Sequence, residues 1–144
     1  MKNIQIAIIA ALFLMVSGCQ KEVLDTDKHF FVRIGKSVLP VWITGNTSSN
    51  TFIVVVHGGP GAFSSLFQRS PAFKDLGKKY GLVYFDQSGT VNDQGTAGIE
   101  DVDDNVFAGQ TDMVVEYVRQ NYSGAKIFLM GHSNGCLLYT SRCV

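Results

Sequence analysis

The chain has 144 residues, which is room for one domain of ordinary size. Apolar residues make up 46% and charged residues 17%, a globular composition that excludes a disordered, collagenous or low-complexity chain. Twelve basic residues balance twelve acidic ones, and this balance argues against a nucleic-acid partner. The three cysteines match neither a metal-binding spacing nor an even disulfide framework, so we expect no metal site.

The first eighteen residues look like a secretion signal. A short positive start precedes the apolar run 4–16, and small residues then lead directly to Cys19. This order is similar to the lipobox of bacterial lipoproteins, which implies a signal peptide over 1–18 and an acylated Cys19 held in a lipid bilayer. The alternative is a transmembrane anchor, but the run is shorter than the roughly 20 residues that a span needs. We expect a cell-envelope protein, lipid-anchored at the outer membrane or facing the periplasm, with a membrane-proximal linker over 19–27.

The last nine residues, 136–144, have an unusual back-translation. CLLYTSRCV can be encoded by TGT CTC TTA TAC ACA TCT AGA TGT GTA, which is the mosaic end of a sequencing-library transposon joined to its own reverse complement. We therefore expect 136–144 to be a sequencing-adapter artefact, excluded from fold reasoning, and 28–135 to be a truncated domain. The alternative is the start of a natural amphipathic helix.

Predicted strands come from β-rich and continuous apolar runs. The runs 29–34 and 38–44 flank a short turn and predict a hairpin. The apolar runs 52–56, 82–85 and 127–130 predict three further strands of the kind that a sheet buries on both faces.

Two predicted helices lie between these three strands. The first begins at Ser70-Pro71, a favourable N-cap and first position, and is expected to end at Gly81. The second covers about 103–122 and is closed by Gly124. Its expected buried face has helical spacing and consists of Val106, Met113, Val114, Tyr117 and Val118. Strand, helix, strand, helix and strand in succession predict a parallel sheet with right-handed crossovers, an α/β fold.

Each of the three buried strands ends in a polar or glycine motif. The motifs are His57-Gly58-Gly59-Pro60-Gly61, Asp86-Gln87-Ser88-Gly89 and Gly131-His132-Ser133-Asn134-Gly135. Ligands of such sheets bind beyond the carboxyl ends of the strands, so these motifs are the candidate site.

The last of these motifs is G-x-S-x-G directly after a strand. A nucleophilic serine needs a sharp strand-to-helix turn that exposes its hydroxyl, and flanking glycines permit that turn. The alternative is an ordinary glycine-rich turn. The earlier HGGPG motif offers backbone N–H groups that can approach a substrate oxygen. Its alternatives are a plain loop or a phosphate-binding loop, but no GxxxxGK[ST] or G-x-G-x-x-G pattern supports nucleotide binding, and we expect no cofactor.

The three motifs together resemble the α/β-hydrolase superfamily and, within it, the proline iminopeptidase-like serine hydrolases. The resemblance implies an α/β-hydrolase fold with the N-terminal half of the sheet only, a hairpin followed by parallel β-α-β-α-β. It implies Ser133 as the nucleophile and the N–H groups of Gly59 and Asn134 as the oxyanion hole. His132 is not expected to be the base. Structural positions around the site are expected to be His57, Gly58, Pro60, Gly61, Asp86, Gln87, Gly131 and Gly135.

The chain departs from the family pattern at three places. Ser88 stands where the family usually has Arg, and Thr90-Val91 replaces a glycine-containing turn, so the resemblance implies that a charge tying this loop down is absent and leaves the order of the loop open. Asn134 stands where the family usually has Trp, a mild change because the oxyanion contact comes from the backbone. The third departure concerns the triad, because the family order is Ser, then Asp or Glu, then His, and none of these acids or bases follows Ser133.

A serine without its base is a weak nucleophile, so we expect the chain as given to be inactive. The complete gene product is expected to be a serine hydrolase, aminopeptidase-like, acting on a small peptide, amide or ester. The alternatives are an esterase and a non-catalytic, lipid-anchored binding protein with a hydrolase-like fold. The run 127–130, central in a complete sheet, is expected here to be an exposed apolar edge.

Overall fold

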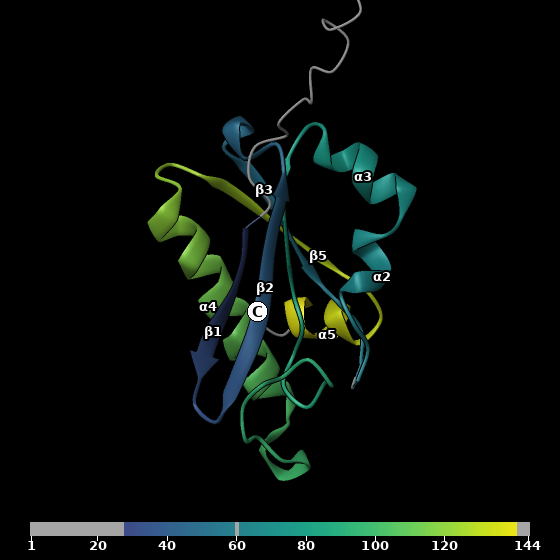
Figure 1. The fold of residues 1–144 in the computed structure, drawn as a ribbon, viewed down its shortest axis with the longest axis vertical. Coiled ribbons are helices and arrows are strands. Elements are labelled where there is room, and N and C mark those ends of the chain that lie inside the picture. The colour runs from purple at the N-terminus through teal and green to yellow at the C-terminus, as the bar shows by residue number, and fades with distance from the viewer. Residues whose placement is uncertain (1–27, 60, 141–144) are drawn as a thin grey trace, which may run out of the picture.

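The predicted hairpin is the first element of the computed structural model, which describes residues 28–59 and 61–140 (Figure 1). Strand β1 (Lys28–Ile34) pairs antiparallel with β2 (Ser37–Gly45) across a turn in which Gly35 has a φ of +55°. The signal peptide, Cys19, the linker and Pro60 lie outside the described residues.

The other three strands extend the hairpin into one five-stranded sheet of order β1-β2-β4-β3-β5. Strands β3 (Thr51–Val56), β4 (Gly81–Phe85) and β5 (Lys126–Gly131) run parallel to one another, and β2 runs antiparallel to β4. The predicted hairpin and parallel strands are therefore confirmed. All three parallel strands end at the same edge of the sheet, which brings the three sequence motifs together.

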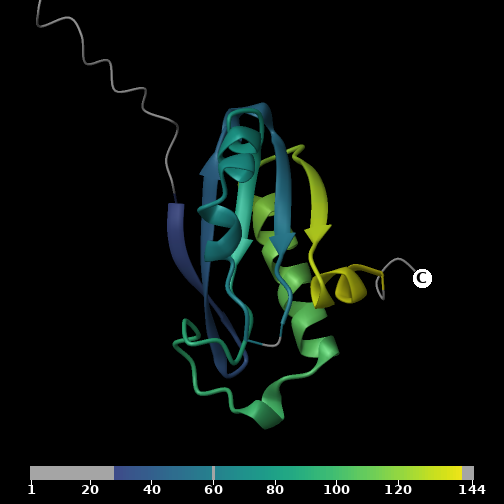
Figure 2. The same cartoon turned by 90° about the vertical axis from the view of Figure 1, so that its right-hand side faces the viewer.

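Helices cover both faces of the sheet (Figures 1 and 2). The short helices α2 (Ser65–Gln68) and α3 (Pro71–Gly77) lie on one face, while α4 (Asp104–Asn121) and α5 (Asn134–Thr140) lie on the other. Two single 3₁₀ turns, Thr47–Ser49 and Ile99–Asp101, lie in the connections. No helix in the described part of the chain is long and apolar enough to cross a bilayer.

Each face of the sheet has its own apolar core. On the α4 side, buried β-branched and aromatic residues of β2, β3 and β4 pack with Phe107, Val114 and Val118 of α4 and with Leu138 of α5. On the α3 side, Leu82, Tyr84 and Val55 pack against partly buried apolar residues, among them Trp42, Phe67 and Phe73. A sheet covered on both sides explains why β4 has no exposed residue.

Two local predictions were wrong. Helix α3 ends at Gly77, and Gly81 instead begins β4, where a Cβ would lie 2.6 Å from the Phe52 ring. Met113 is 38% exposed, because the buried stripe of α4 runs through Phe107 and Val114 and includes polar positions. Helix α2, which is too short to show a period, was not predicted, whereas α5 follows the strand-to-helix turn expected at Ser133.

Strand β5 is at one edge of the described sheet, as expected for 127–130. Its side chains alternate, and Phe128 is 59% exposed and Met130 39% exposed, so the strand is not buried on both faces. Helix α5 continues to Thr140, within the segment expected to be an adapter artefact; that expectation concerns the DNA and stays a prediction.

Candidate active site

Ser133 stands on a sharp turn between β5 and α5. Its φ is +55°, in the left-handed region that non-glycine residues rarely adopt, and its side chain is exposed. The His132 N–H donates to the Val56 carbonyl at 3.0 Å, and the Cys136 N–H donates to the Ser133 carbonyl at 2.9 Å. The turn thus presents the serine hydroxyl at the carboxyl end of the sheet and passes directly into α5. Backbone strain of this kind collects at functional sites.

The flanking glycines make this turn possible because backbone passes where their side chains would be. A Cβ on Gly131 would lie 2.6 Å from the Gly135 carbonyl oxygen. A Cβ on Gly135 would collide with the Val56 carbonyl oxygen and lie 2.9 Å from that of His57. Helix α5 therefore starts in direct contact with the end of β3.

The HGG motif after β3 lies against the nucleophile turn. A Cβ on Gly58 would be 2.8 Å from the Ser133 Cβ and 3.3 Å from its Oγ. Gly59 follows, with the Gly61 backbone nitrogen 3.3 Å and the Gln87 Oε1 3.6 Å from where its Cβ would be. Three chain segments therefore meet around Ser133, one from each of β3, β4 and β5.

His57 is fully buried and fixes the HGG backbone. Its Nε2 accepts the Gln87 N–H at 3.1 Å, so the ring proton is on Nδ1, which donates to the Gly58 carbonyl at 2.6 Å. Gln87 also donates from its side chain to the His57 carbonyl at 3.3 Å. Because a trans peptide holds its C=O and N–H in opposite directions, the Gly59 N–H points away from the His57 ring. This geometry fits a structural role for His57 and leaves the Gly59 N–H available as a donor.

Stability is expected to depend on pH through His57. Burial is the largest effect on this ring and lowers its pKa below the ordinary 6.5, although the Gly58 hydrogen bond and the Asp86 charge act in the opposite direction. The unfolded chain binds the proton near pH 6.5, whereas the folded chain resists it. The contribution of neutral, buried His57 to the free energy of unfolding is therefore fully present above about pH 6.5. It is lost as the pH drops below that value. Denaturant midpoints followed from neutral to mildly acidic pH measure this, and His57→Gln should flatten the slope; an unchanged slope in that variant would contradict the assignment.

Asp86, at the end of β4, ties two loops to the sheet. The carboxylate is fully buried, and its two oxygens accept the Ser64 N–H at 2.7 Å and the Asn92 Nδ2 at 2.6 Å. Its own N–H donates to the Pro40 carbonyl at 3.2 Å. Asp86 therefore holds the start of α2 and the 88–95 loop in place, which fits a structural role beside the site.

Asp86→Asn is expected to destabilise the fold by about 1–3 kcal/mol, because an amide has one acceptor oxygen for the two donors, of which the Ser64 N–H is buried. A denaturant titration gives the change in unfolding free energy. Asp75→Asn is the matched control, since Asp75 is exposed and its pair with Lys78 is 71% exposed on both sides. An equal response of the two variants would refute the two-loop role of Asp86.

The charge that the family pattern has at position 88 is absent here, and the loop after Asp86 is held by other hydrogen bonds. Ser88 is buried, its hydroxyl lies 2.5 Å from that of Ser37, and its N–H donates to the Gln110 Oε1 at 3.2 Å. The Gln110 amide donates back to the Ser88 hydroxyl. Asp93 accepts the Val38 N–H at 2.8 Å. Hydrogen bonds to the hairpin and to α4 thus hold the loop without a charged side chain at position 88.

The site as described holds a serine but no base for it. His132 is exposed, and its ring lies edge-on to Phe67 at 5.5 Å. Within residues 28–59 and 61–140, no hydrogen bond joins the Ser133 hydroxyl to a histidine or a carboxylate, and no cluster of side chains could hold a metal. Asn134, half-buried, is the first residue of α5, and its N–H has no acceptor within that helix.

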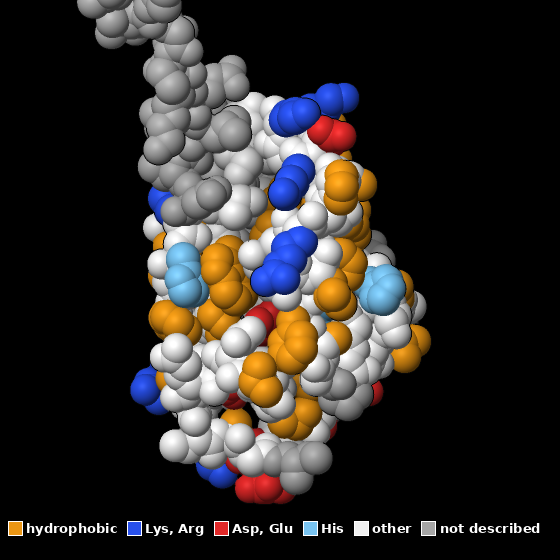
Figure 3. All heavy atoms as spheres, turned by 45° about the vertical axis from the view of Figure 1, so that its right-hand side comes forward, with side chains coloured by type: hydrophobic (Ala, Val, Ile, Leu, Met, Phe, Trp, Pro, Cys, Tyr) orange, Lys and Arg blue, Asp and Glu red, His pale blue; other side chains and the backbone are white. Residues whose placement is uncertain are grey.

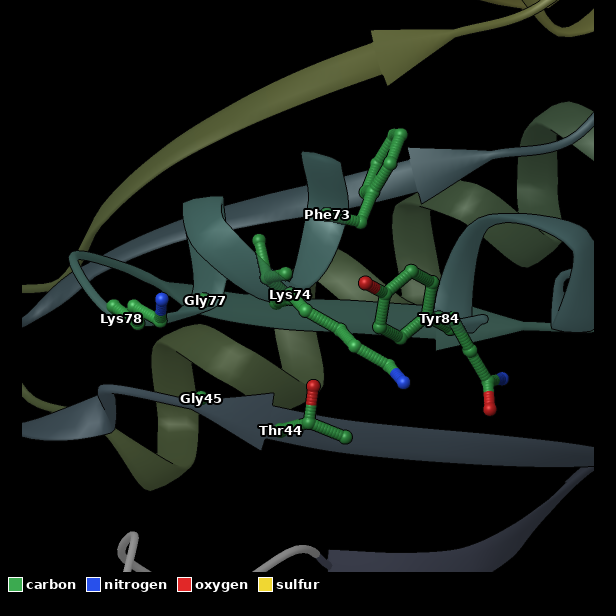
Figure 4. Close-up of a pocket in the computed structure, with 9 residues that line it drawn as sticks. Thr44, Gly45, Phe73, Lys74, Gly77, Lys78 and Tyr84 are labelled. Atoms are coloured by element: carbon green, nitrogen blue, oxygen red, sulfur yellow. The ribbon is translucent and has the colours of Figure 1, made fainter. Parts of the chain in front are cut away.

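Two pockets lie away from Ser133. The larger, about 420 Å³, lies between β2, β4 and α3, where Thr44, Lys74 and Tyr84 line one space (Figure 4). Burial raises the pKa of Tyr84 to about 12, so its hydroxyl stays protonated. The smaller, about 220 Å³, lies between the hairpin and the 91–94 segment. Neither includes the predicted site residues.

Sequence reasoning missed the residues that hold the site loops from a distance. Ser64, Asn92 and Gln110 are 22, 6 and 22 residues from the partners they bond. No local pattern marks such pairs, because they form only once the strands are placed side by side.

No protein-family model and no curated protein matches the sequence. Solved structures are similar to it. A proline iminopeptidase-related protein of Thermus thermophilus superposes with a TM-score of 0.66 at 21% identity, over 81% of this chain and 40% of that one. A serine hydrolase homologue of Coxiella burnetii superposes with a TM-score of 0.65 at 21% identity, over 85% of this chain and 59% of that one. A thioesterase domain from the curacin biosynthetic pathway superposes with a TM-score of 0.62 at 19% identity, over 81% of this chain and 41% of that one.

The chain thus spans about two fifths of the first and third of these proteins. An epoxide hydrolase of Vigna radiata is also similar, so proteins named for different reactions share this similarity of fold. At these identities the likeness is one of fold, and the described residues form part of an α/β-hydrolase fold.

Proposed function

We propose that the complete gene product is a serine hydrolase in which Ser133 attacks the carbonyl carbon of a peptide, amide or ester. The observation that carries this proposal is the turn itself: an exposed serine with a φ of +55°, between two glycines that admit no side chain and against Gly58. A serine that served only packing would not need a strained backbone and an exposed hydroxyl.

The chemistry follows from the groups around the turn. A base takes the hydroxyl proton while the Ser133 oxygen bonds to the carbonyl carbon, and the carbonyl oxygen becomes an oxyanion. The N–H groups of Gly59 and Asn134 stabilise that charge, at roughly 2.7–4 kcal/mol for a donor of this kind. The leaving amine or alcohol takes a proton, and water then hydrolyses the acyl-enzyme. The acid and the base of the triad come, in this proposal, from residues that this chain does not include.

Aminopeptidase-like action on N-terminal peptide bonds is the specificity we favour. Its support is the set of three motifs and the likeness to a proline iminopeptidase-related protein. An esterase is the alternative on the same scaffold, since a thioesterase domain is about equally similar. A non-catalytic binding protein is the rival of another class, and Ser88 and Asn134, which depart from the family pattern, favour it. We further propose that an acylated Cys19 anchors the protein to the envelope.

The proposal is tested by comparing the chain as given with the complete gene product. Aminoacyl anilides and short acyl esters are the substrates, because they report both specificities. The 144-residue chain is expected to give no serine-dependent turnover, since it lacks the base, and the complete product is expected to turn over at least one substrate class. Turnover by the short chain that disappears in Ser133→Ala would refute its proposed inactivity. A folded complete product that is inert and unlabelled by a fluorophosphonate would favour the binding protein.

A further inference from the structure

The two ends of the sheet carry opposite charge. At the amino end of the parallel strands, the loops 45–51, 77–81 and 121–126 contain three lysines, Lys78, Lys79 and Lys126, and no acidic residue. All three lysines are exposed. This end therefore presents a basic surface, which we call the amino-end surface.

The neighbouring helices α3 and α4 add two basic and two acidic residues to this end, so the net positive charge comes from the loop lysines. Arg119 lies in the last turn of α4, which ends at the same edge, and Lys74 lies in the last turn of α3, four residues before Lys78. The two acids nearby are paired: Asp75 with Lys78 at 2.7 Å and Glu116 with Arg119 at 3.9 Å. Figure 3 shows blue side chains gathered in the upper part of the face it presents.

The carboxyl end, where Ser133 lies, is acidic. The long connection from β4 to α4 contains no basic residue, and the exposed or partly exposed acids from there to the start of α4 are Asp93, Glu100, Asp101, Asp103 and Asp104. Lys36, on the β1–β2 turn at this end, is bonded to Asp101 at 2.8 Å. Red side chains accordingly gather at the lower end of the face in Figure 3. The charge separation therefore follows the strand axis, with the nucleophile at the negative end.

The described chain also begins at the basic end. Lys28 opens β1, pairs with Ile43 near the end of β2, and places its Nζ 5.0 Å from the Tyr122 ring beyond the end of α4. Lys28 is nine residues beyond Cys19, a reach of at most about 32 Å. An anchor at Cys19 would thus keep the amino-end surface within about 32 Å of a bilayer.

We propose that the amino-end surface docks on anionic lipid headgroups, so that Ser133 faces away from the membrane and takes its substrate from the aqueous phase. The inference rests on the proposed anchoring through Cys19. Each lysine near an anionic bilayer adds attraction that is screened within a Debye length, so docking depends on charge and on salt. The acidic end is repelled by the same surface, which gives the docked protein one orientation.

Charge reversal at the two ends provides a matched test. Lys78→Glu with Lys79→Glu changes the amino-end surface, whereas Arg33→Glu with Lys36→Glu makes the same change of net charge at the other end. All four residues are exposed, and each pair includes one lysine bonded to an aspartate. The complete gene product without signal peptide or acyl chain is mixed with phosphatidylcholine vesicles with and without phosphatidylglycerol. Reversal at 78 and 79 is expected to lower partitioning onto anionic vesicles by about tenfold or more, while reversal at 33 and 36 has a much smaller effect.

Equal losses in the two variants, or no preference for anionic vesicles, would overturn the inference. Binding to heparin without binding to vesicles would assign the surface to a polyanionic polymer instead and would also overturn it. High salt should abolish the preference, since the Debye length is about 3 Å at 1 M.

The orientation of the acylated protein is measured by comparing the chemical modification of its lysines in vesicles with their modification in detergent. We expect Lys78 and Lys79 to be protected and Lys36 to stay reactive; the reverse pattern would refute the proposed orientation. Fluorophosphonate labelling of the same samples reports separately on Ser133. If Ser133 is not labelled but Lys78 and Lys79 are still protected, the hydrolase function is refuted and the docking surface is retained. If Cys19→Ser does not release the protein from the membrane, the proposed anchor is refuted.

Discussion

Ser133→Ala is expected to lower kcat/KM of the complete gene product by about 10⁴-fold or more, because removal of a catalytic serine leaves only the oxyanion donors and substrate binding. Folding should be unchanged, since the hydroxyl is exposed and makes no hydrogen bond to a histidine or carboxylate within the described residues. The measurement is steady-state turnover of the best substrate, with Ser123→Ala, at another exposed serine, as the control. Turnover retained in Ser133→Ala would exclude the serine mechanism.

The same position gives a sharper test with Ser133→Gly. Glycine adopts a φ of +55° without the clash of a Cβ, so this variant is expected to gain about 1 kcal/mol of stability while it loses turnover. A gain in stability together with a loss of activity would show that the strained backbone at Ser133 serves the reaction and not the fold. A loss of stability in Ser133→Gly would show that the serine supports the fold.

Gly135→Ala is expected to cost about 3 kcal/mol or more of unfolding free energy. The added Cβ would meet the carbonyl oxygens of Val56 and His57, which are backbone atoms of β3 and its end and cannot rotate away. Displacement of α5 would also shift Ser133, so fluorophosphonate labelling should fall with stability. Thermal or denaturant unfolding of the complete product gives the first quantity.

Gly109→Ala is the matched control for that substitution. It makes the same chemical change within α4, where a Cβ would have nothing within 4 Å. Alanine is the better helix former by about 0.8–1 kcal/mol, so this variant should be slightly more stable than the parent. Destabilisation of both variants to the same extent would contradict the close approach of α5 to β3.

Much of the fold could be predicted because its signals are local. The run Phe52–Val56 is long, apolar and β-branched, and it forms a buried strand as expected. Ends of elements were less certain: Gly81 reads as a helix stop, but it begins β4 because the Phe52 ring leaves no room for a side chain there. Met113 fits a helical period, yet the actual stripe of α4 passes through Gln110, whose partner is Ser88 across the connection.

The candidate site divides in the same way. The motif glycines predict where backbone must approach closely, and Gly58, Gly131 and Gly135 all make such approaches. The hydrogen bonds that hold the loops were not predictable, because Asp86 comes within reach of Ser64 and Asn92 only when β4 has its place in the sheet. Replacement of an expected Arg by Ser88 left the order of this loop open, and a buried network with Ser37 holds it.

The most direct test of the account is to treat the complete gene product with a fluorophosphonate and map the adduct by mass spectrometry. The account predicts one adduct, on Ser133, and none in the Gly135→Ala variant once the turn is displaced. An adduct on another serine, or none on a folded complete product, would contradict the assignment of Ser133 as the nucleophile.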